Sequence, residues 1–254
     1  MYGNAKSTRL KAMRLLLNLL VPLGLVCTVL VGCDETKTTC PELDPPFEEI
    51  SEEAKVIALC LSGEMRPPCS LSRTVERNLA AIRSNYAEQY AALDTLTFIP
   101  PWKPGCIHID FDETTARMVQ DGEYHDWDNL NRQFGLDTLD IHVSGSVGHA
   151  SLCFEGLLHS RRLAEAYAYL PGVLGVRAGS YGIEGSPHQR LYPRRTGTRI
   201  TYLFYYQGWI SRYWYFRVRG SDVELVGTWR EWLDWPPPDW WEEAKQNIIQ
   251  SWMW

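Results

Sequence analysis

The segments that decide the fold are CIHIDFD (residues 106–112), LDTLDIHV (136–143), SLCFEGLL (151–158) and VLGVRA (173–178). Apolar and polar residues alternate along them, which predicts β-strands with one buried face. Apolar residues at helical spacing occupy the interval between the first and second of these segments and the interval between the third and fourth. The first helical stretch follows the first strand and is broken at Gly122, and the second begins at Ser160 and ends at Pro171-Gly172.

The resulting order over residues 105–182 is β-α-β-β-α-β, the split arrangement of ferredoxin-like α+β folds. Such a unit has a four-stranded antiparallel sheet in which the first and third strands are neighbours. Cys106 and Cys153 belong to these strands and to the same face. They are therefore a candidate cross-strand disulfide, which requires Cα atoms within about 7 Å of each other.

Strand alternation separates two faces of this sheet. Ile107 and Ile109 belong to the core face, whereas the opposite face gathers Cys106, His108, Asp110, Asp140, His142, Cys153 and Glu155. His108, Asp110 and His142 are a candidate metal site or acid–base centre. The alternative is a wet or aromatic-covered sheet face, and the lack of a fixed ligand spacing in the sequence favours it. We expect no cofactor.

The segment Asp110-Phe111-Asp112-Glu113-Thr114 resembles the first motif of haloacid-dehalogenase-like phosphatases. In that family the first Asp attacks phosphorus and the second protonates the leaving group, which implies a metal-dependent hydrolase that uses Asp110 and Asp112. The alternative is that Asp112 and Thr114 cap the following helix. The sequence favours the cap, because no Lys lies between Lys103 and Lys245 and the element order lacks a parallel sheet.

The N-terminus predicts the compartment. Residues 1–14 are basic, and residues 15–32 (LLLNLLVPLGLVCTVLVG) form an apolar run of 18 that is typical of an export signal. Leu30-Val31-Gly32-Cys33 resembles the lipobox of bacterial lipoproteins, which implies cleavage before Cys33 and a lipid on its thiol. The alternative is an uncut transmembrane anchor. Both interpretations place the body outside the cytoplasm, in the bacterial cell envelope.

The net charge of the chain indicates which classes of partner it can bind. The chain has 25 Lys and Arg against 31 Asp and Glu, and 45% of its residues are hydrophobic, enough for a packed core. Without residues 1–32 the net charge is about −10, which argues against binding to a phosphate backbone. We expect the membrane as a partner through the lipid anchor, another envelope protein as a further partner, and no nucleic acid.

The remaining cysteines fit an oxidising compartment. Five thiols remain once the signal and Cys33 are set aside. Besides Cys106 and Cys153, the pair Cys60 and Cys69 flanks the short loop LSGEMRPP and is the second candidate disulfide. Cys40 is the odd thiol, in the acidic and proline-containing segment 33–50 that we expect to be a flexible tether.

Helices are expected on both sides of the ferredoxin-like unit. Residues 51–104 predict one helix from Ser51 to about Leu61 and a second after Ser72, with the apolar stripe Val75, Leu79, Ile82, Tyr86 and Leu93. Near the other end of the chain, Asp239 and Glu242 form a capping box that predicts a final helix.

The region 183–254 is rich in aromatic residues. After an Arg- and Pro-rich loop, a three-stranded meander is predicted from RITYLFYYQ (199–207), WISRYWYFRVRG (209–220) and DVELVGTW (222–229). If its rings are exposed, the candidate binding residues are Tyr202, Phe204, Trp209 and Trp214. The alternative is that the rings form a core, which the strands need in order to be stable.

The stretch from Trp127 to Gly182 resembles subtilase propeptides and related inhibitor domains. The resemblance rests on DNLNRQFG (128–135), a strand pair, RRLAEAYAYLPGV (161–173) and a last strand with a Gly-rich exit. The same helix-PGV-strand block resembles a group of uncharacterised bacterial lipoproteins. The resemblance implies a ferredoxin-like fold. The sequence departs from the propeptide pattern at RAGSYGIEG (177–185), where an acidic residue, Pro and Asn are usual.

The sequence as a whole predicts an α+β protein with five consecutive parts. These are a signal peptide (1–32), a tether (33–50), a helical segment (51–104), the ferredoxin-like unit (105–182), and the aromatic meander with its helix (183–254). We expect a non-catalytic protein-binding or envelope-structural lipoprotein. The enzymatic alternative is the phosphatase-like hydrolase of Asp110 and Asp112.

Overall fold

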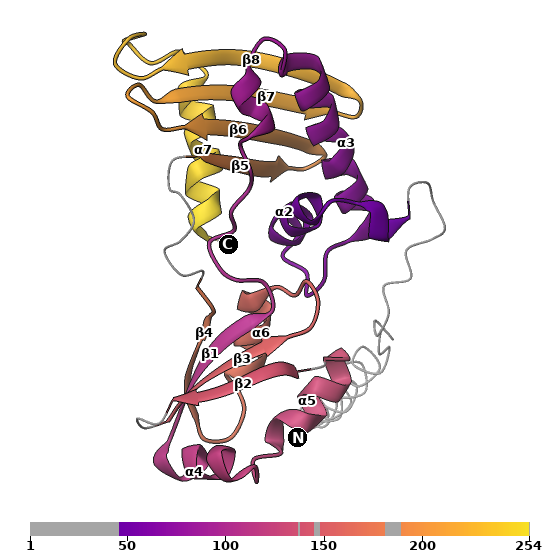
Figure 1. The fold of residues 1–254 in the computed structure, drawn as a ribbon, viewed down its shortest axis with the longest axis vertical. Coiled ribbons are helices and arrows are strands. Elements are labelled where there is room, and N and C mark those ends of the chain that lie inside the picture. Colours follow the sequence, from indigo (N-terminus) through magenta and orange to yellow (C-terminus); the bar gives the residue numbers. More distant parts are fainter. Residues whose placement is uncertain (1–45, 137, 145–147, 181–188, 254) are drawn as a thin grey trace, which may run out of the picture. The chain divides into compact units, whose positions relative to one another are not determined.

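The computed structural model describes residues 46–136, 138–144, 148–180 and 189–253. The described chain is an α+β fold with two four-stranded antiparallel sheets (Figure 1). The strand order is β2-β3-β1-β4 in the first sheet and β5-β6-β7-β8 in the second. None of the helices in these ranges has the length and hydropathy of a membrane span.

The first sheet and its helices form the ferredoxin-like unit, so the predicted element order is confirmed. Its elements are β1 (Cys106–Phe111), α4 (Glu113–Asp121), α5 (Asp126–Phe134), β2 (Thr138–Ser144), β3 (His149–Phe154), α6 (Ser160–Tyr167) and β4 (Val173–Ala178). β1 pairs antiparallel with β3 on one side and with β4 on the other. β1 is therefore a central strand, and the two crossovers are built around it.

The core of this unit lies on one face of β1. Ile107, Ile109 and Phe111 are buried there, as the alternation predicts. They belong to one apolar cluster with Trp127 of α5 and Tyr167 of α6. Burial of an apolar side chain of this size stabilises a fold by about 1.5–3 kcal/mol, so these contacts hold the helices on the sheet.

Several boundaries in this unit differ from the sequence-based prediction: β2 begins at Thr138, β3 begins at His149, and α6 ends at Tyr167, before the predicted stop at Pro171-Gly172. β3 ends at Phe154 rather than at Leu158, because Gly156 takes a left-handed conformation (φ 84°) and interrupts the extended backbone. α6 has His159 at its N-cap, and Ser160 is its first residue. The Ser160 hydroxyl donates a hydrogen bond to the Lys103 carbonyl (2.5 Å) instead of capping the helix.

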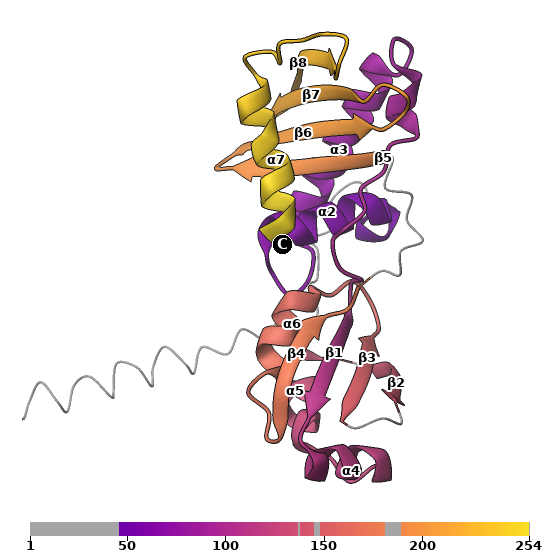
Figure 2. The same cartoon turned by 90° about the vertical axis from the view of Figure 1, so that its left-hand side faces the viewer.

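The second sheet carries helices on both faces (Figure 2). Its strands are β5 (Gln189–Thr196), β6 (Arg199–Tyr206), β7 (Arg212–Arg219) and β8 (Asp222–Arg230). One face packs on α2 (Glu52–Ser62), α3 (Cys69–Tyr86) and the short turns η1 (Phe47–Glu49) and η2 (Ala91–Asp94). The other face packs on α7 (Trp241–Met253). Because both faces are covered, the alternating aromatic residues of this sheet are buried on both sides.

The prediction of a loop for the Arg- and Pro-rich segment before residue 199 is wrong for residues 189–196. They form β5, a fourth strand that pairs antiparallel with β6. Pro193 is tolerated because β5 lies at the edge of the sheet, where one side of the backbone needs no partner. Leu191 of the same strand is buried in the core that includes α2 and α3.

The N-terminal helices follow the prediction in part. Ser51 caps α2 as expected, and its hydroxyl accepts a hydrogen bond from the backbone N–H of Ala54 (3.3 Å). α3 begins at Cys69 and ends at Tyr86, so Leu93 lies in η2 and not on the same helix. Ile50 is buried in the core, so residues 46–50 belong to the folded body and not to the expected tether.

Gly148 is expected to be essential for the approach of β3 to β1. Gly148 and Gly122 have the same left-handed conformation (φ 73°), but a Cβ on Gly148 would lie 2.5 Å from the carbonyl oxygen of Phe111, whereas a Cβ on Gly122 would meet nothing within 4 Å. We expect Gly122→Ala to lower the free energy of unfolding by about 1 kcal/mol, and Gly148→Ala by at least about 2 kcal/mol more, because backbone cannot yield cheaply. Urea denaturation of both variants tests this. Equal losses would contradict it.

Candidate functional site

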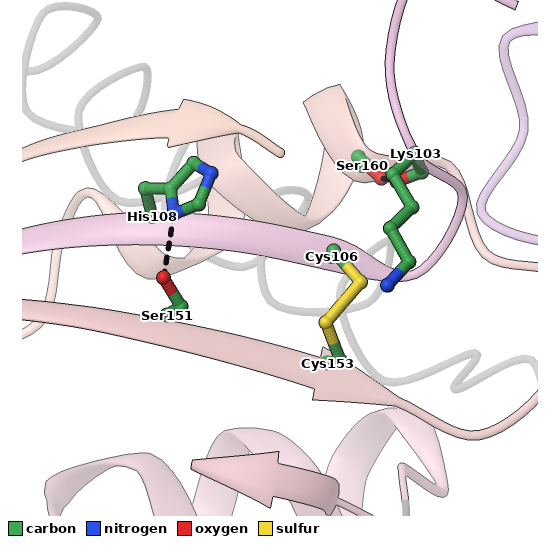
Figure 3. Close-up of a disulfide and its surroundings, with 6 residues drawn as sticks. All are labelled: Lys103, Cys106, His108, Ser151, Cys153 and Ser160. Atoms are coloured by element: carbon green, nitrogen blue, oxygen red, sulfur yellow. Dashed lines mark hydrogen bonds between the residues drawn. A yellow bond between two sulfur atoms is a disulfide. The ribbon is translucent and has the colours of Figure 1, made fainter. Parts of the chain in front are cut away.

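Cys106 and Cys153 form the predicted cross-strand disulfide (Figure 3). The two residues are direct partners in the β1–β3 register, and their Cα atoms are 4.2 Å apart. The bridge lies on the face of the sheet that points away from the core formed by Ile107 and Ile109. It therefore fixes the register of β1 and β3 beside the polar residues predicted as a site.

Cys60 and Cys69 do not form the second predicted disulfide. Cys60 is a buried free thiol in α2, and burial raises its pKa. Cys69 is disulfide-bonded, but not to Cys60. A short spacing is not sufficient here, because Cys60 lies on the apolar side of α2 and belongs to the core cluster. Cys33 and Cys40 lie outside the described residues.

Four polar side chains of β1 and β3 form two hydrogen-bonded pairs, which we call the polar ladder: His108, Ser151, Asp110 and His149. Nδ1 of His108 lies 2.7 Å from Oγ of Ser151 (Figure 3), and Nδ1 of His149 lies 2.6 Å from Oδ1 of Asp110. Both pairs are direct partners in the strand register. The two imidazole rings stack with centroids 5.7 Å apart. Cross-strand pairing thus brings together residues that lie about forty positions apart in the chain.

The charges around the polar ladder favour a neutral His108. Burial lowers the pKa of His108 first, and the neighbouring Arg177 and His149 lower it further, while Asp110 acts in the opposite direction. Arg177 reaches this position because it is the β4 partner of His108 in the register. His108 is therefore a neutral hydrogen-bonding group at pH 7.

The polar ladder lacks the geometry of a nucleophilic relay. A Ser-His-Asp relay needs one imidazole between the hydroxyl and the carboxylate, whereas Ser151 and Asp110 bond different histidines. Among the described residues, no group of three or more His, Cys, Asp and Glu could hold a metal ion. The predicted metal site of His108, Asp110 and His142 stays a prediction, since the side chains of Asp140 and His142 lie outside the described residues.

The two carboxylates of the phosphatase-like motif have separate partners. Asp112 is the N-cap of α4, and its Oδ1 accepts a hydrogen bond from the backbone N–H of Thr115 (2.7 Å). That backbone hydrogen bond lowers the pKa of Asp112. Asp110 is bonded to His149 on the sheet. The sheet that carries them is antiparallel. This geometry matches the capping alternative for Asp112.

Three of the four predicted aromatic binding residues are core residues. Tyr202, Phe204 and Trp214 are buried in the cluster between the second sheet and the helices α2 and α3. The Tyr202 hydroxyl accepts a hydrogen bond from Asn78 of α3 (3.0 Å). The core interpretation, which the sequence favours over an exposed row, is confirmed for these three residues because both faces of the sheet are covered. Trp209, in the loop after β6, is fully exposed.

Trp209, which the sequence predicts as a binding residue, belongs to an exposed group whose other three members are not predicted. The group, which we call the Trp rim, consists of Trp209, Trp232, Leu233 and Trp235, with exposed fractions of 105, 83, 57 and 76%. Trp209 lies between β6 and β7, and the others lie between β8 and α7. Both loops leave the same end of the second sheet (Figure 1). A signal was present in the sequence, since these Trp residues interrupt the strand alternation.

Hydrogen bonds fix the two loops of the Trp rim. The backbone N–H of Glu231 donates to the carbonyl of Ser211 (3.0 Å), which joins one loop to the other. The Arg230 guanidinium pairs with the Asp234 carboxylate through two hydrogen bonds of 3.0 and 2.8 Å. The Trp229 indole donates to the Asp234 carbonyl (3.0 Å). The exposed rings are therefore displayed by an ordered framework.

His159 is a buried histidine outside the polar ladder. Its ring lies 4.5 Å from the ring of Trp102, and its Nδ1 has no hydrogen-bond partner among the described residues. Burial, followed by the charges of Arg162 and Arg161, lowers the pKa of His159 to about 4. His159 is therefore a packing residue that must stay neutral.

Comparison with protein-family models, with curated proteins and with solved structures finds no match to the chain.

Loss of the cross-strand disulfide is expected to destabilise the fold. Cys106 and Cys153 are 47 positions apart, so their bridge removes much conformational freedom from the unfolded chain. We expect Cys106→Ala/Cys153→Ala to lower the free energy of unfolding by about 2–4 kcal/mol. Urea denaturation followed by circular dichroism measures this, with the native spectrum as the control for folding. A variant as stable as the unaltered protein would contradict the expectation.

Acid is expected to destabilise the protein through His159. The unfolded chain binds a proton at His159 below about pH 6.5, and the folded chain binds it only near pH 4, so stability is complete above pH 6.5 and falls as the pH drops toward 4. We expect a loss of about 1–2 kcal/mol between pH 7 and pH 5. In His159→Gln the same interval should show a smaller slope. Equal slopes in urea denaturation series would show that His159 is not responsible.

Proposed function

We propose that this chain is a lipid-anchored protein of the bacterial cell envelope, with Cys33 as the lipidated residue. The support is the N-terminal sequence pattern: a basic segment, an apolar run of 18 residues, and Leu30-Val31-Gly32-Cys33 at its end. The cross-strand disulfide is the single structural observation that carries this proposal, because disulfides persist in oxidising compartments outside the cytoplasm.

The body of the protein is proposed to be a non-catalytic binding module. In the polar ladder, Nδ1 of each histidine is hydrogen-bonded to a side chain of the neighbouring strand, and the Asp112 carboxylate caps α4. What the described surface offers instead is contact area: the Trp rim on the second sheet, and the exposed Tyr169 and Leu174 on the ferredoxin-like unit. These features suit binding better than chemistry.

A protein partner is proposed for the ferredoxin-like unit. The resemblance to subtilase propeptides and inhibitor domains supports this, since the strand order β2-β3-β1-β4 is the one that the resemblance implies. Leu174 lies on β4, an edge strand of that sheet, where an extended segment of a partner can add to the backbone hydrogen bonds. The disulfide and the polar ladder would stiffen this binding surface.

The anchor is tested on the full chain expressed in a bacterium. We expect the protein in the membrane fraction, with an N-terminal peptide that begins at a lipid-modified Cys33 in mass spectrometry. Cys33→Ala should lack this modification. If the membrane-bound protein retains residues 1–32, it is held by a transmembrane anchor and not by a lipid. Protein found in the cytoplasm would contradict the proposal altogether.

The non-catalytic part is tested by phosphatase measurements. Purified protein with Mg²⁺ and an aryl phosphate is expected to show no hydrolysis above that of the Asp110→Asn variant, because Asp110 pairs with His149 and Asp112 caps α4, so each carboxylate already has a structural role. Hydrolysis that disappears in Asp110→Asn would contradict the proposal and would favour the phosphatase-like alternative.

A further inference from the structure

We infer that the Trp rim inserts into the interfacial region of a phospholipid bilayer and so sets how the body lies on the membrane. The inference rests on the proposed function for the presence of a bilayer nearby. Four of the eight large apolar side chains that are exposed in the described chain belong to the rim: Trp209, Trp232, Leu233 and Trp235. Their concentration on two adjacent loops distinguishes them from scattered surface residues.

The composition of the Trp rim fits the headgroup level of a membrane. Three of its four members are Trp, whose rings have an apolar body and a polar N–H, and Trp is enriched at the boundary between hydrocarbon and water. The composition of the rim therefore matches side chains that insert shallowly into a bilayer.

The framework under the Trp rim displays the rings before any partner arrives. Trp232 has a left-handed backbone (φ 74°), and it is the only such non-glycine residue among those described, so the turn that carries its ring has a defined conformation. Arg230 and Asp234 clamp the loop on either side of it. The bond from Glu231 to Ser211 ties it to the loop of Trp209. Little conformational freedom is therefore lost when the rings are immersed.

The charges near the Trp rim permit insertion into a neutral surface. Arg230 is paired with Asp234, and Glu231 accepts a hydrogen bond from the Tyr213 hydroxyl (3.2 Å). Arg212 is exposed at the start of β7, and its long side chain can hold its charge at the level of the lipid phosphates. Since the body without residues 1–32 is strongly acidic, attraction to anionic lipid cannot drive this contact. We expect it to be insensitive to salt and to lipid charge.

The chain keeps the bilayer within reach of the body. Residues 34–45 separate the proposed lipid site at Cys33 from Pro46, the first described residue, and fully extended they span only about 40 Å. Tethering over such a distance gives an effective concentration on the order of millimolar. A weak contact by a few indole rings is therefore enough to hold an orientation.

The test uses the indole fluorescence of the full chain reconstituted into phosphatidylcholine vesicles with brominated acyl chains, which quench rings that enter the bilayer. Residues 1–45 contain no Trp, so the anchor itself gives no signal. We expect quenching of the unaltered protein to fall several-fold in Trp209→Ala/Trp232→Ala/Trp235→Ala. The matched control is Met118→Ala/Ile249→Ala, which removes exposed apolar side chains outside the two rim loops and should leave the quenching unchanged.

The outcomes separate the rim from the anchor. Equal quenching in the rim variant and the unaltered protein overturns the inference. A rim-dependent change in indole fluorescence on addition of a soluble glycan or an envelope protein, with none on vesicles, also overturns it. Lipid-modified Cys33 without rim-dependent quenching overturns the rim alone. Rim-dependent quenching with an unmodified Cys33 supports the rim and overturns the anchor. Circular dichroism and a thermal melt confirm that the rim variant is folded, which is expected because its altered side chains are exposed.

Discussion

The antiparallel pairing of β1 with β3 is the interaction on which the ferredoxin-like unit depends. In the observed register Ile107 and Ile109 face the core, and Cys106, His108 and Asp110 face away from it. A shift by one residue would exchange the two faces and bury a carboxylate and an imidazole, which is costly without partners. The disulfide and the two hydrogen-bonded pairs of the polar ladder all bridge the same two strands, so they oppose that shift.

The sequence predicts this unit well because its signals are local. Alternation marks β1, and Gly122 and Gly135 end α4 and α5 in left-handed conformations that favour glycine. The Cys106–Cys153 pair follows from the strand order once that order is known. Cys60 is not predictable in this way, because its short spacing to Cys69 does not indicate which side of α2 the thiol occupies. Likewise, β5 escapes prediction because Arg and Pro argue for a loop, whereas an edge strand accepts both.

In the second sheet, the exposure of the aromatic residues does not follow from the strand pattern alone. Alternation along β6 and β7 is compatible with one buried face or with two, and only the presence of α7 opposite α2 and α3 decides for two. Tyr202, Phe204 and Trp214 are core residues for that reason. The rings left for a partner sit in the loops, where Trp209 and Trp235 are outside the periodic pattern. Around the second sheet, the exposed Trp residues lie in the loops, whereas Trp214 and Trp229 of the strands are buried.

A disulfide map of the protein purified from bacterial membranes tests both the β1–β3 register and the proposed extracytoplasmic location. Digestion without reduction, followed by mass spectrometry, is expected to give a peptide that links Cys106 to Cys153, with Cys60 as an unmodified thiol. Free thiols at Cys106 and Cys153, or a bridge from either of them to another cysteine, would contradict the register and remove the structural support for the proposed extracytoplasmic location.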